Sequence, residues 1–200
     1  MQSLIDQGLR LDGRKLLEHR EIKIYRIELD TILIEIGGTI LSIQILRPYN
    51  KPKSKTQLSF TVNGTNKNED YAKSIESIFN RIIILPENTY LDININVKQE
   101  DGSTLVHLVN GISISLCCNG INMKSLVFGI TVGLYGSNLI IDVLENEEKK
   151  GYLSYIFSDN NCIYLKTHFK ISEYVFNQMI DTAEEYKSSV YELFTAYLRK

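Results

Sequence analysis

Alternating hydrophobic and polar residues mark the first quarter of the chain. Between residues 22 and 46 isoleucine and leucine recur at nearly every second position, and Gly37-Gly38 interrupts the pattern. This period is typical of strands with one buried face. We therefore predict an antiparallel β meander over 22–46. An exposed loop should follow at 47–55, where two prolines and four basic residues break the alternation.

The rest of the chain mixes strand and helix patterns. Short apolar or alternating runs predict strands at 57–62, 91–97, 126–135, 139–144, 153–157 and 162–167. Apolar residues three and four positions apart predict a helix over 70–83 that stops before Pro86, and a long C-terminal helix capped by Ser172. Strands and helices in this order indicate an α+β fold.

A third helix should begin at Ser103 and end at Asn119-Gly120, where glycine can form a left-handed cap. The apolar residues that we expect on one stripe of this helix are Leu105, Leu108, Val109, Ile112 and Leu116. Gly111 lowers helix stability by about 1 kcal/mol relative to alanine. We therefore expect a neighbouring backbone to approach closely at Gly111.

Composition limits the class of protein. With 200 residues, 44% of them hydrophobic, the chain can bury one sizeable core, so we expect a single domain over 1–200 with residues 1–20 as an N-terminal arm. The net charge of −2 argues against a protein that binds RNA tightly by itself. No apolar run approaches the length of a membrane span, and the N-terminus lacks the pattern of a signal peptide. We expect a soluble intracellular protein without membrane contact.

The three cysteines give no sign of a metal site. Cys117 and Cys118 are adjacent within a helical pattern, and the number of cysteines is odd. We therefore predict no metal site and no cofactor, and a reducing compartment.

The turn before the third helix is the best candidate for chemistry. Asp101-Gly102 precedes the first helical residues, and a helix N-terminus behind a glycine can bind an anion. Ser103 and Thr104 are typical helix-capping residues. His107, alone on a partly buried helix, is interpreted as structural.

Three stretches of the sequence form a set: GLRLDGRKLLEHR (8–20), QEDGSTLVHLVNGISISL (99–116) and GITVGLYGSNLIIDVLENEE (129–148). Their order and spacing resemble the RNase PH superfamily, and in particular the ring subunits of the eukaryotic RNA exosome. The resemblance runs from about Gly8 into the C-terminal helix. It implies the RNase PH-like fold, also called ribosomal protein S5 domain 2-like, with mixed sheets, packed helices and a long C-terminal helix.

The resemblance also identifies where an active site would lie. Catalytic members of the superfamily use phosphate to attack the 3′ end of RNA, and they bind that phosphate with an arginine in a D-G-G-T-R-like turn. Here the turn is 101–105, and Leu105 stands in the arginine position. Gly102, Ser103 and Thr104 are then a vestigial phosphate turn. Asp142 and Glu148 match the catalytic carboxylates in spacing, and we interpret them as vestigial residues of a solvated acidic loop.

Ring subunits that have lost phosphorolysis still line a channel for single-stranded RNA. The basic residues that the resemblance makes candidates for RNA contact are Lys67, Lys73, Lys51, Lys53 and Lys55. The arm residues Leu9 to Arg14 carry both charges, so we assign them to internal ion pairing and packing or subunit contact.

We therefore expect a non-catalytic subunit of the exosome ring that supports RNA processing and degradation in the nucleus, nucleolus and cytoplasm. The expected partners are paralogous ring subunits, cap subunits, an associated exonuclease and RNA in the shared channel. One alternative is a phosphate-dependent 3′-5′ exoribonuclease that uses Asp142 and Glu148. Another is a protein that keeps the fold for interaction alone.

Overall fold

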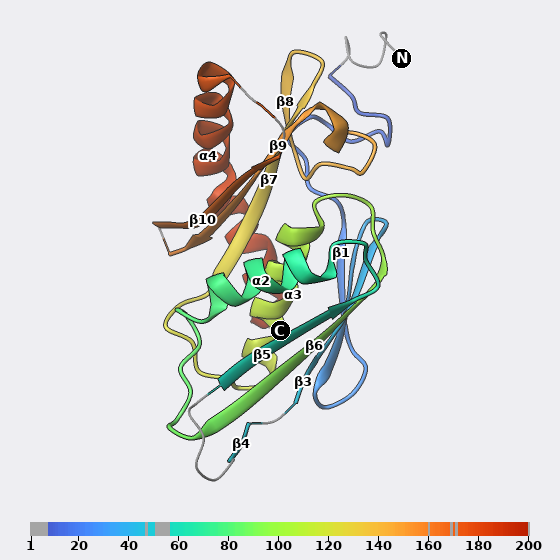
Figure 1. Ribbon diagram of the computed structural model, residues 1–200. Helices are drawn as coiled ribbons and strands as arrows, with labels where there is room; N and C mark the ends of the chain where they lie inside the picture. Colours follow the sequence, from blue (N-terminus) through green and yellow to red (C-terminus); the bar gives the residue numbers. More distant parts are fainter. Residues whose placement is uncertain are drawn as a thin grey trace.

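The computed structural model describes residues 8–46, 48–50, 57–159, 161–168, 170 and 172–199, although the side chain of Asn50 is not described. Lys51, Lys53 and Lys55, which we predicted as RNA contacts, lie outside the described residues. Within these residues two β-sheets enclose a central helix, and two further helices cover the outside (Figure 1). The α+β prediction is confirmed.

The six-stranded sheet contains the predicted meander. It comprises β1 (Ile22–Arg26), β2 (Thr31–Ile36), β3 (Thr39–Ile45), β4 (Tyr49–Asn50), β5 (Gln57–Asn63) and β6 (Thr89–Gln99). Strands β1, β2, β3 and β6 are antiparallel neighbours, and β5 pairs with β6 in parallel. In β2 and β3 every second residue is buried, which is the alternation that predicted them.

The four-stranded sheet is antiparallel throughout. It comprises β7 (Val127–Tyr135), β8 (Asn138–Ile141), β9 (Tyr152–Ser158) and β10 (Asn161–His168), in the order β10-β9-β7-β8. Strand β8 is shorter than predicted, because at Asp142 the backbone enters the left-handed region, with φ of 51°. The segment 142–147 then leads to the short 3₁₀ helix η1 (Glu148–Lys150).

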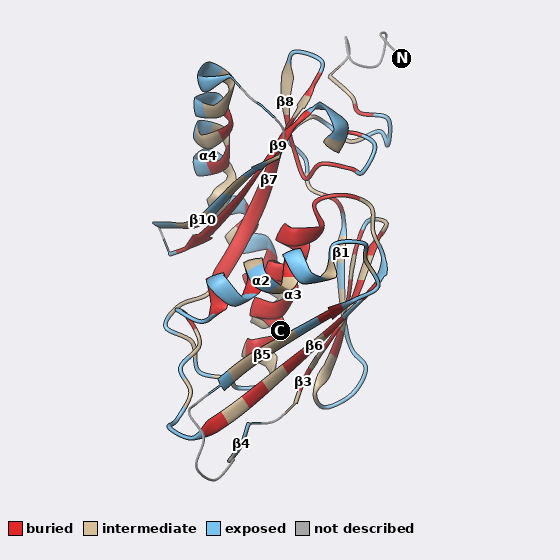
Figure 2. Cartoon of the chain, viewed as in Figure 1, coloured by how far each residue is buried: buried red, intermediate tan, exposed pale blue. Residues whose placement is uncertain are grey.

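Helix α3 (Thr104–Cys118) lies between the two sheets and is buried on every side from Thr104 to Leu116 (Figure 2). The prediction of a single apolar stripe was therefore wrong, because β3 and β7 pack on this helix together with α4. At Gly111 a Cβ atom would lie 2.7 Å from Cδ1 of Ile43, so side chains of the sheet approach closely there rather than the expected backbone. Gly120, with φ of 67°, confirms the left-handed cap.

The other two helices lie on the outside. Helix α2 (Asn68–Phe79) packs against β5 and ends four residues earlier than predicted, since Ile83 leaves the helix and bridges Met123. Helix α4 (Glu173–Leu198) packs on β7 and β9. Its Ser172 cap is confirmed, because the side chain accepts a hydrogen bond from the backbone N–H of Val175.

No helix in the described part of the chain is long and apolar enough to cross a membrane.

Candidate functional site

The turn before α3 is covered by the acidic segment, residues 142–148. Gly102 has φ of 77°, and a Cβ atom at this position would lie 2.4 Å from backbone atoms of Val143 and Leu144. Only glycine fits here, because both the conformation and the space exclude a side chain. The neighbouring Ser103 is also left-handed, with φ of 55°. The candidate phosphate turn is therefore in direct contact with the segment that carries the candidate carboxylates.

The hydroxyl of Ser103 does not cap α3, so this part of the capping prediction was wrong. Its Oγ instead donates a 2.8 Å hydrogen bond to the carbonyl of Val143. The backbone N–H of Ser103 donates to Oε1 of Glu148 at 2.9 Å. Thr104 is buried at the start of α3. The carboxylate of Glu148 thus satisfies an amide at the N-terminus of α3.

Leu105 lies in the first turn of α3 and is 4% exposed. It belongs to the main hydrophobic core. A guanidinium at this position would have to enter that core, where an unpaired charge is strongly unfavourable. This position is therefore built for an aliphatic side chain.

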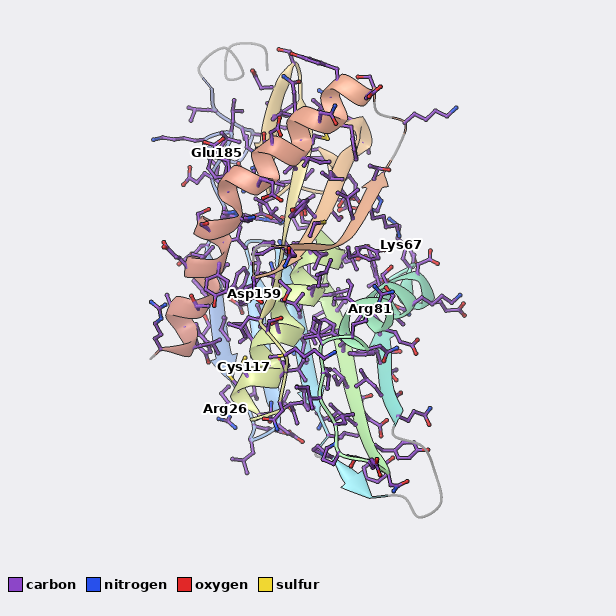
Figure 3. All side chains as sticks on the ribbon, turned by 90° about the vertical axis from the view of Figure 1, so that its left-hand side faces the viewer. Arg26, Lys67, Arg81, Cys117, Asp159 and Glu185 are labelled. Carbon is purple, nitrogen blue, oxygen red and sulfur yellow. The ribbon has the colours of Figure 1, made fainter. Side chains whose placement is uncertain are left out.

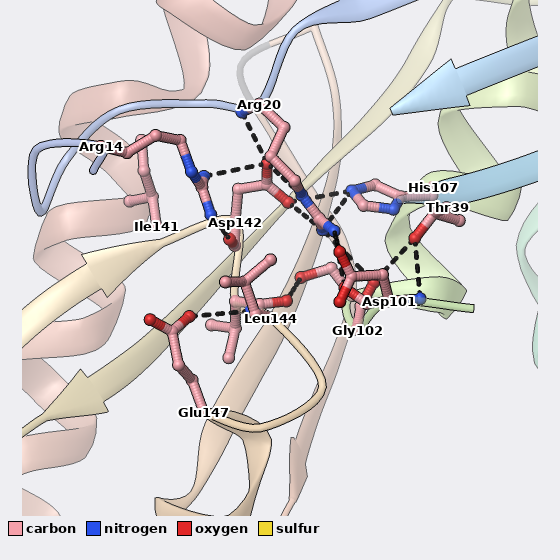
Figure 4. A network of polar contacts seen from close by, with 12 residues as sticks. Arg14, Arg20, Thr39, Asp101, Gly102, His107, Ile141, Asp142, Leu144 and Glu147 are labelled. Atoms are coloured by element: carbon pink, nitrogen blue, oxygen red, sulfur yellow. Dashed lines mark hydrogen bonds and ion pairs between the residues drawn. The ribbon is translucent and has the colours of Figure 1, made fainter. Parts of the chain in front are cut away.

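Asp142 is buried and fully engaged by its neighbours (Figure 4). Arg20 donates from Nε to Oδ2 at 3.0 Å and from Nη2 to Oδ1 at 2.6 Å. The backbone N–H of Arg20 adds a bond to Oδ2 at 2.8 Å, and Nη1 of Arg14 lies 3.4 Å from the same oxygen. This two-pronged arginine pairing is among the strongest hydrogen-bonded arrangements in proteins.

His107 is the remaining partner of Asp142. Its Nε2 lies 3.0 Å from Oδ1 of the carboxylate. Burial lowers the pKa of His107, and the positive charge of Arg20 adds to this effect. A neutral imidazole bonds the carboxylate by donating from Nε2. The structural interpretation of His107 is therefore supported, with Asp142 as the group that it serves.

The same contacts determine the charge of Asp142. Burial by itself would raise the pKa of this carboxyl, but the hydrogen bonds and charges of His107 and Arg20 hold it well below its usual range. The carboxylate is ionised, and its charge is balanced by Arg20. Since both oxygens already accept hydrogen bonds, the residues present do not fit a divalent metal ion on Asp142, and we derive no step through one. In the described part of the chain no group of three His, Cys, Asp or Glu residues could hold a metal ion.

The N-terminal arm carries a second buried ion pair. Arg10 is 0% exposed, and it donates to Glu147 from Nε at 3.1 Å and from Nη2 at 2.5 Å. It also bonds the carbonyls of Ile141 and Asp142. The predicted internal ion pairing of the arm is confirmed by Arg14, whose Nε lies 2.6 Å from Oδ2 of Asp12.

The acidic segment is therefore not the solvated loop that we expected. Asp142 and Glu147 are buried because Arg20 and Arg10 neutralise them from more than a hundred residues away in the sequence. Local composition could not reveal these partners. The only available signal was that both arginines lie in the block 8–20, which also contributed to the family resemblance.

Asp142 and Glu148 line different cavities. Asp142 borders a small cavity of about 10 Å³ together with His19, Arg20 and His107. Glu148 borders an open cavity of about 160 Å³ together with Gly102 and Thr104. The two candidate carboxylates therefore border separate cavities.

Of the predicted RNA contacts, two lysines lie among the described residues. Lys67 is exposed just before α2 (Figure 3). It lines the cavity that Glu148 borders. Lys73 is exposed on α2, where its Nζ lies 3.9 Å from Glu69. Lys67 is therefore the predicted contact that the fold brings to the candidate phosphate turn.

Known exosome proteins are similar to this chain in sequence. None of the family models compared with the chain matches it. The chain is 29% identical over 170 residues to exosome complex component SKI6 of Saccharomyces cerevisiae, covering 71% of this chain and 69% of that protein. It is 25% identical over 175 residues to exosome complex component Rrp41 of Archaeoglobus fulgidus, covering 75% of this chain and 68% of that protein.

Two solved structures share the fold. Rrp46 of rice (Oryza sativa) matches with a TM-score of 0.85 at 20% identity, covering 96% of this chain and 100% of that chain. The archaeal exosome core matches with a TM-score of 0.78 at 14% identity, covering 97% and 94%.

These findings confirm that the chain has the RNase PH-like fold of exosome core proteins. Within that class, its sequence is similar to those of proteins named exosome component Rrp41, or ribosomal RNA-processing protein 41, which the blocks at 8–20 and 129–148 also resemble.

Proposed function

We propose that this chain is a ring subunit of an RNA exosome core and that it guides single-stranded RNA without cleaving it. The relationship to Rrp41 and the match along almost the whole fold support the ring assignment. Its partners are then RNase PH-like paralogues in the ring, cap subunits and an associated exonuclease. The expected places of action are the nucleus, the nucleolus and the cytoplasm.

The engagement of Asp142 carries the non-catalytic part of the proposal. A general acid or a metal-binding carboxylate needs an oxygen that substrate or metal can reach. Both oxygens of Asp142 are held by Arg20 and His107, and the residue is 3% exposed. Leu105 supplies no guanidinium at the position where active relatives hold the attacking phosphate.

Contact with RNA is then weak for each subunit and strong only in the ring. The net charge of −2 provides little phosphate affinity to one chain. A strand that passes several subunits gains affinity through multivalency. Lys67, exposed beside the open cavity, is the described residue that we assign to the RNA backbone. Crosslinking of RNA threaded through the ring should reach the tip of α2 near Lys67, and the interaction-only alternative predicts no such crosslink.

Two experiments test the proposal. Purification of the tagged chain from its native cell should yield a stoichiometric set of exosome proteins, whereas a lone chain or a homohexamer contradicts the ring assignment. The purified complex should then be incubated with single-stranded RNA with and without inorganic phosphate. Release of nucleoside diphosphates that requires phosphate and is lost in Glu148→Gln would establish the phosphorolytic alternative instead.

A further inference from the structure

Glu148 lies where the N-terminus of α3 would receive an anion. Helix α3 has 15 residues, and its first amides have no partner within the helix. The backbone N–H of Ser103 points to Oε1 of Glu148 at a distance of 2.9 Å. A carboxylate is a good partner here, because it meets both an unsatisfied donor and the positive end of the helix dipole.

The surroundings hold this carboxylate in place. The positive charge of Lys67 acts on Glu148 from the cavity rim. Two further carboxylates, Glu100 and Glu145, face it across the same cavity. Burial raises the pKa of Glu148, and the negative charges of Glu100 and Glu145 raise it further. The hydrogen bond from the Ser103 amide and the positive charge of Lys67 lower this pKa.

The segment behind Glu148 cannot move away easily. The backbone of Val143 and Leu144 lies against Gly102, and the Ser103 hydroxyl bonds the Val143 carbonyl. Glu147, one residue before Glu148, is fixed by the buried guanidinium of Arg10. The backbone N–H of Leu144 also donates to Glu147 at 2.9 Å. The backbone that leads to Glu148 is thus held against the turn before α3.

We propose that Glu148 closes the anion position of α3, so that the turn holds a carboxylate of the chain itself and rejects external phosphate. Glu148 acts as a specificity determinant because its carboxylate occupies the place that an external anion would take. The negative charges of Glu100 and Glu145 further disfavour phosphate there. This inference rests on the proposed function in one respect: it gives the reason why a ring subunit with this turn is inert toward phosphate.

The test is titration of the full-length chain with inorganic phosphate, followed by calorimetry. Glu148→Ala should bind phosphate at least about tenfold more tightly than the native chain. The exchange leaves the Ser103 amide free to donate a charge-assisted hydrogen bond to phosphate. Glu145→Gln is the matched control, since it removes a negative charge from the same cavity without touching Ser103. It should change phosphate binding by less than about twofold, as expected for an exposed charge.

A second measurement does not depend on phosphate affinity. In amide NMR spectra the Ser103 resonance should titrate with pH as Glu148 ionises, and this titration should be absent in Glu148→Gln. Persistence of the titration in Glu148→Gln would overturn the proposal. Equal phosphate affinity of the native chain and Glu148→Ala would also overturn the proposal. An equal gain in phosphate affinity in Glu148→Ala and Glu145→Gln would overturn it as well.

These results are separable from the proposed function. Phosphate binding by the native chain that is as tight as that of Glu148→Ala overturns the closure by Glu148 while leaving the ring assignment intact. The ring assignment fails only if the exosome partners do not co-purify, and the non-catalytic assignment fails only if phosphate-dependent nucleoside diphosphate release is seen.

Discussion

Replacement of Arg20 by methionine should destabilise the chain strongly, because it leaves Asp142 buried without its main partner. The variant loses the bonds from the guanidinium to both oxygens of Asp142, at 3.0 and 2.6 Å. It also leaves the carbonyl of Asp101 without the 2.6 Å bond from Nη1. Methionine replaces the aliphatic stem of the arginine side chain, so loss of packing along the stem contributes little to the expected effect.

The magnitude follows from the burial of the pair. Arg20 and Asp142 have side chains that are 4% and 3% exposed. Removal of one partner of such a pair lowers the free energy of unfolding by about 3–5 kcal/mol. For a chain of this size each kcal/mol lowers the melting temperature by about 2–4 °C, which amounts to a fall of about 6–20 °C.

Urea unfolding followed by circular dichroism measures the free energy of unfolding of the native chain and of Arg20→Met. The comparison requires that the dependence of this free energy on urea concentration has the same slope in both proteins. Arg14→Met is the matched control, because Arg14 reaches the same carboxylate only at 3.4 Å and is paired with the partly exposed Asp12. The control should lose about 1 kcal/mol or less. Equal losses in the two variants, or a loss below about 1 kcal/mol in Arg20→Met, would refute the assignment of Arg20 as the main counterion of Asp142.

Three further predictions concern neighbouring features of the fold. Folding lowers the pKa of Asp142, so its ion pair contributes fully to stability above about pH 4, and this contribution is lost as pH falls through the lower folded pKa. Stability should therefore fall more steeply with acid in the native chain than in Asp142→Asn. Urea midpoints measured between about pH 2 and 5 test this. Gly102→Ala should lower the free energy of unfolding by more than about 2 kcal/mol, since its φ is 77° and its Cβ would meet backbone at 2.4 Å; a melting temperature equal to the native value would contradict this. Ser172→Ala should remove the cap of α4 and lower stability by about 1 kcal/mol in thermal unfolding, whereas Ser172→Asp should retain it.

Several features of the fold could be predicted from local sequence because their causes are local. Alternation of apolar residues defined β2 and β3, since successive side chains of a strand point to opposite faces. Ser172 defined the start of α4 because its cap involves only the next three residues. The end of α2 was missed, since the pairing of Ile83 with Met123 lies outside its own segment.

The candidate site shows the same division. The sequence alone placed Gly102 and Ser103 before a helix, and its family resemblance predicted that Leu105 stands where active relatives bind phosphate with an arginine. Only the tertiary structure decided the state of the acidic residues, because Arg10 and Arg20 reach Glu147 and Asp142 from the other end of the chain. A charge pattern identifies which groups are present, but whether they are exposed, paired or placed on a helix N-terminus depends on the elements that the fold packs around them.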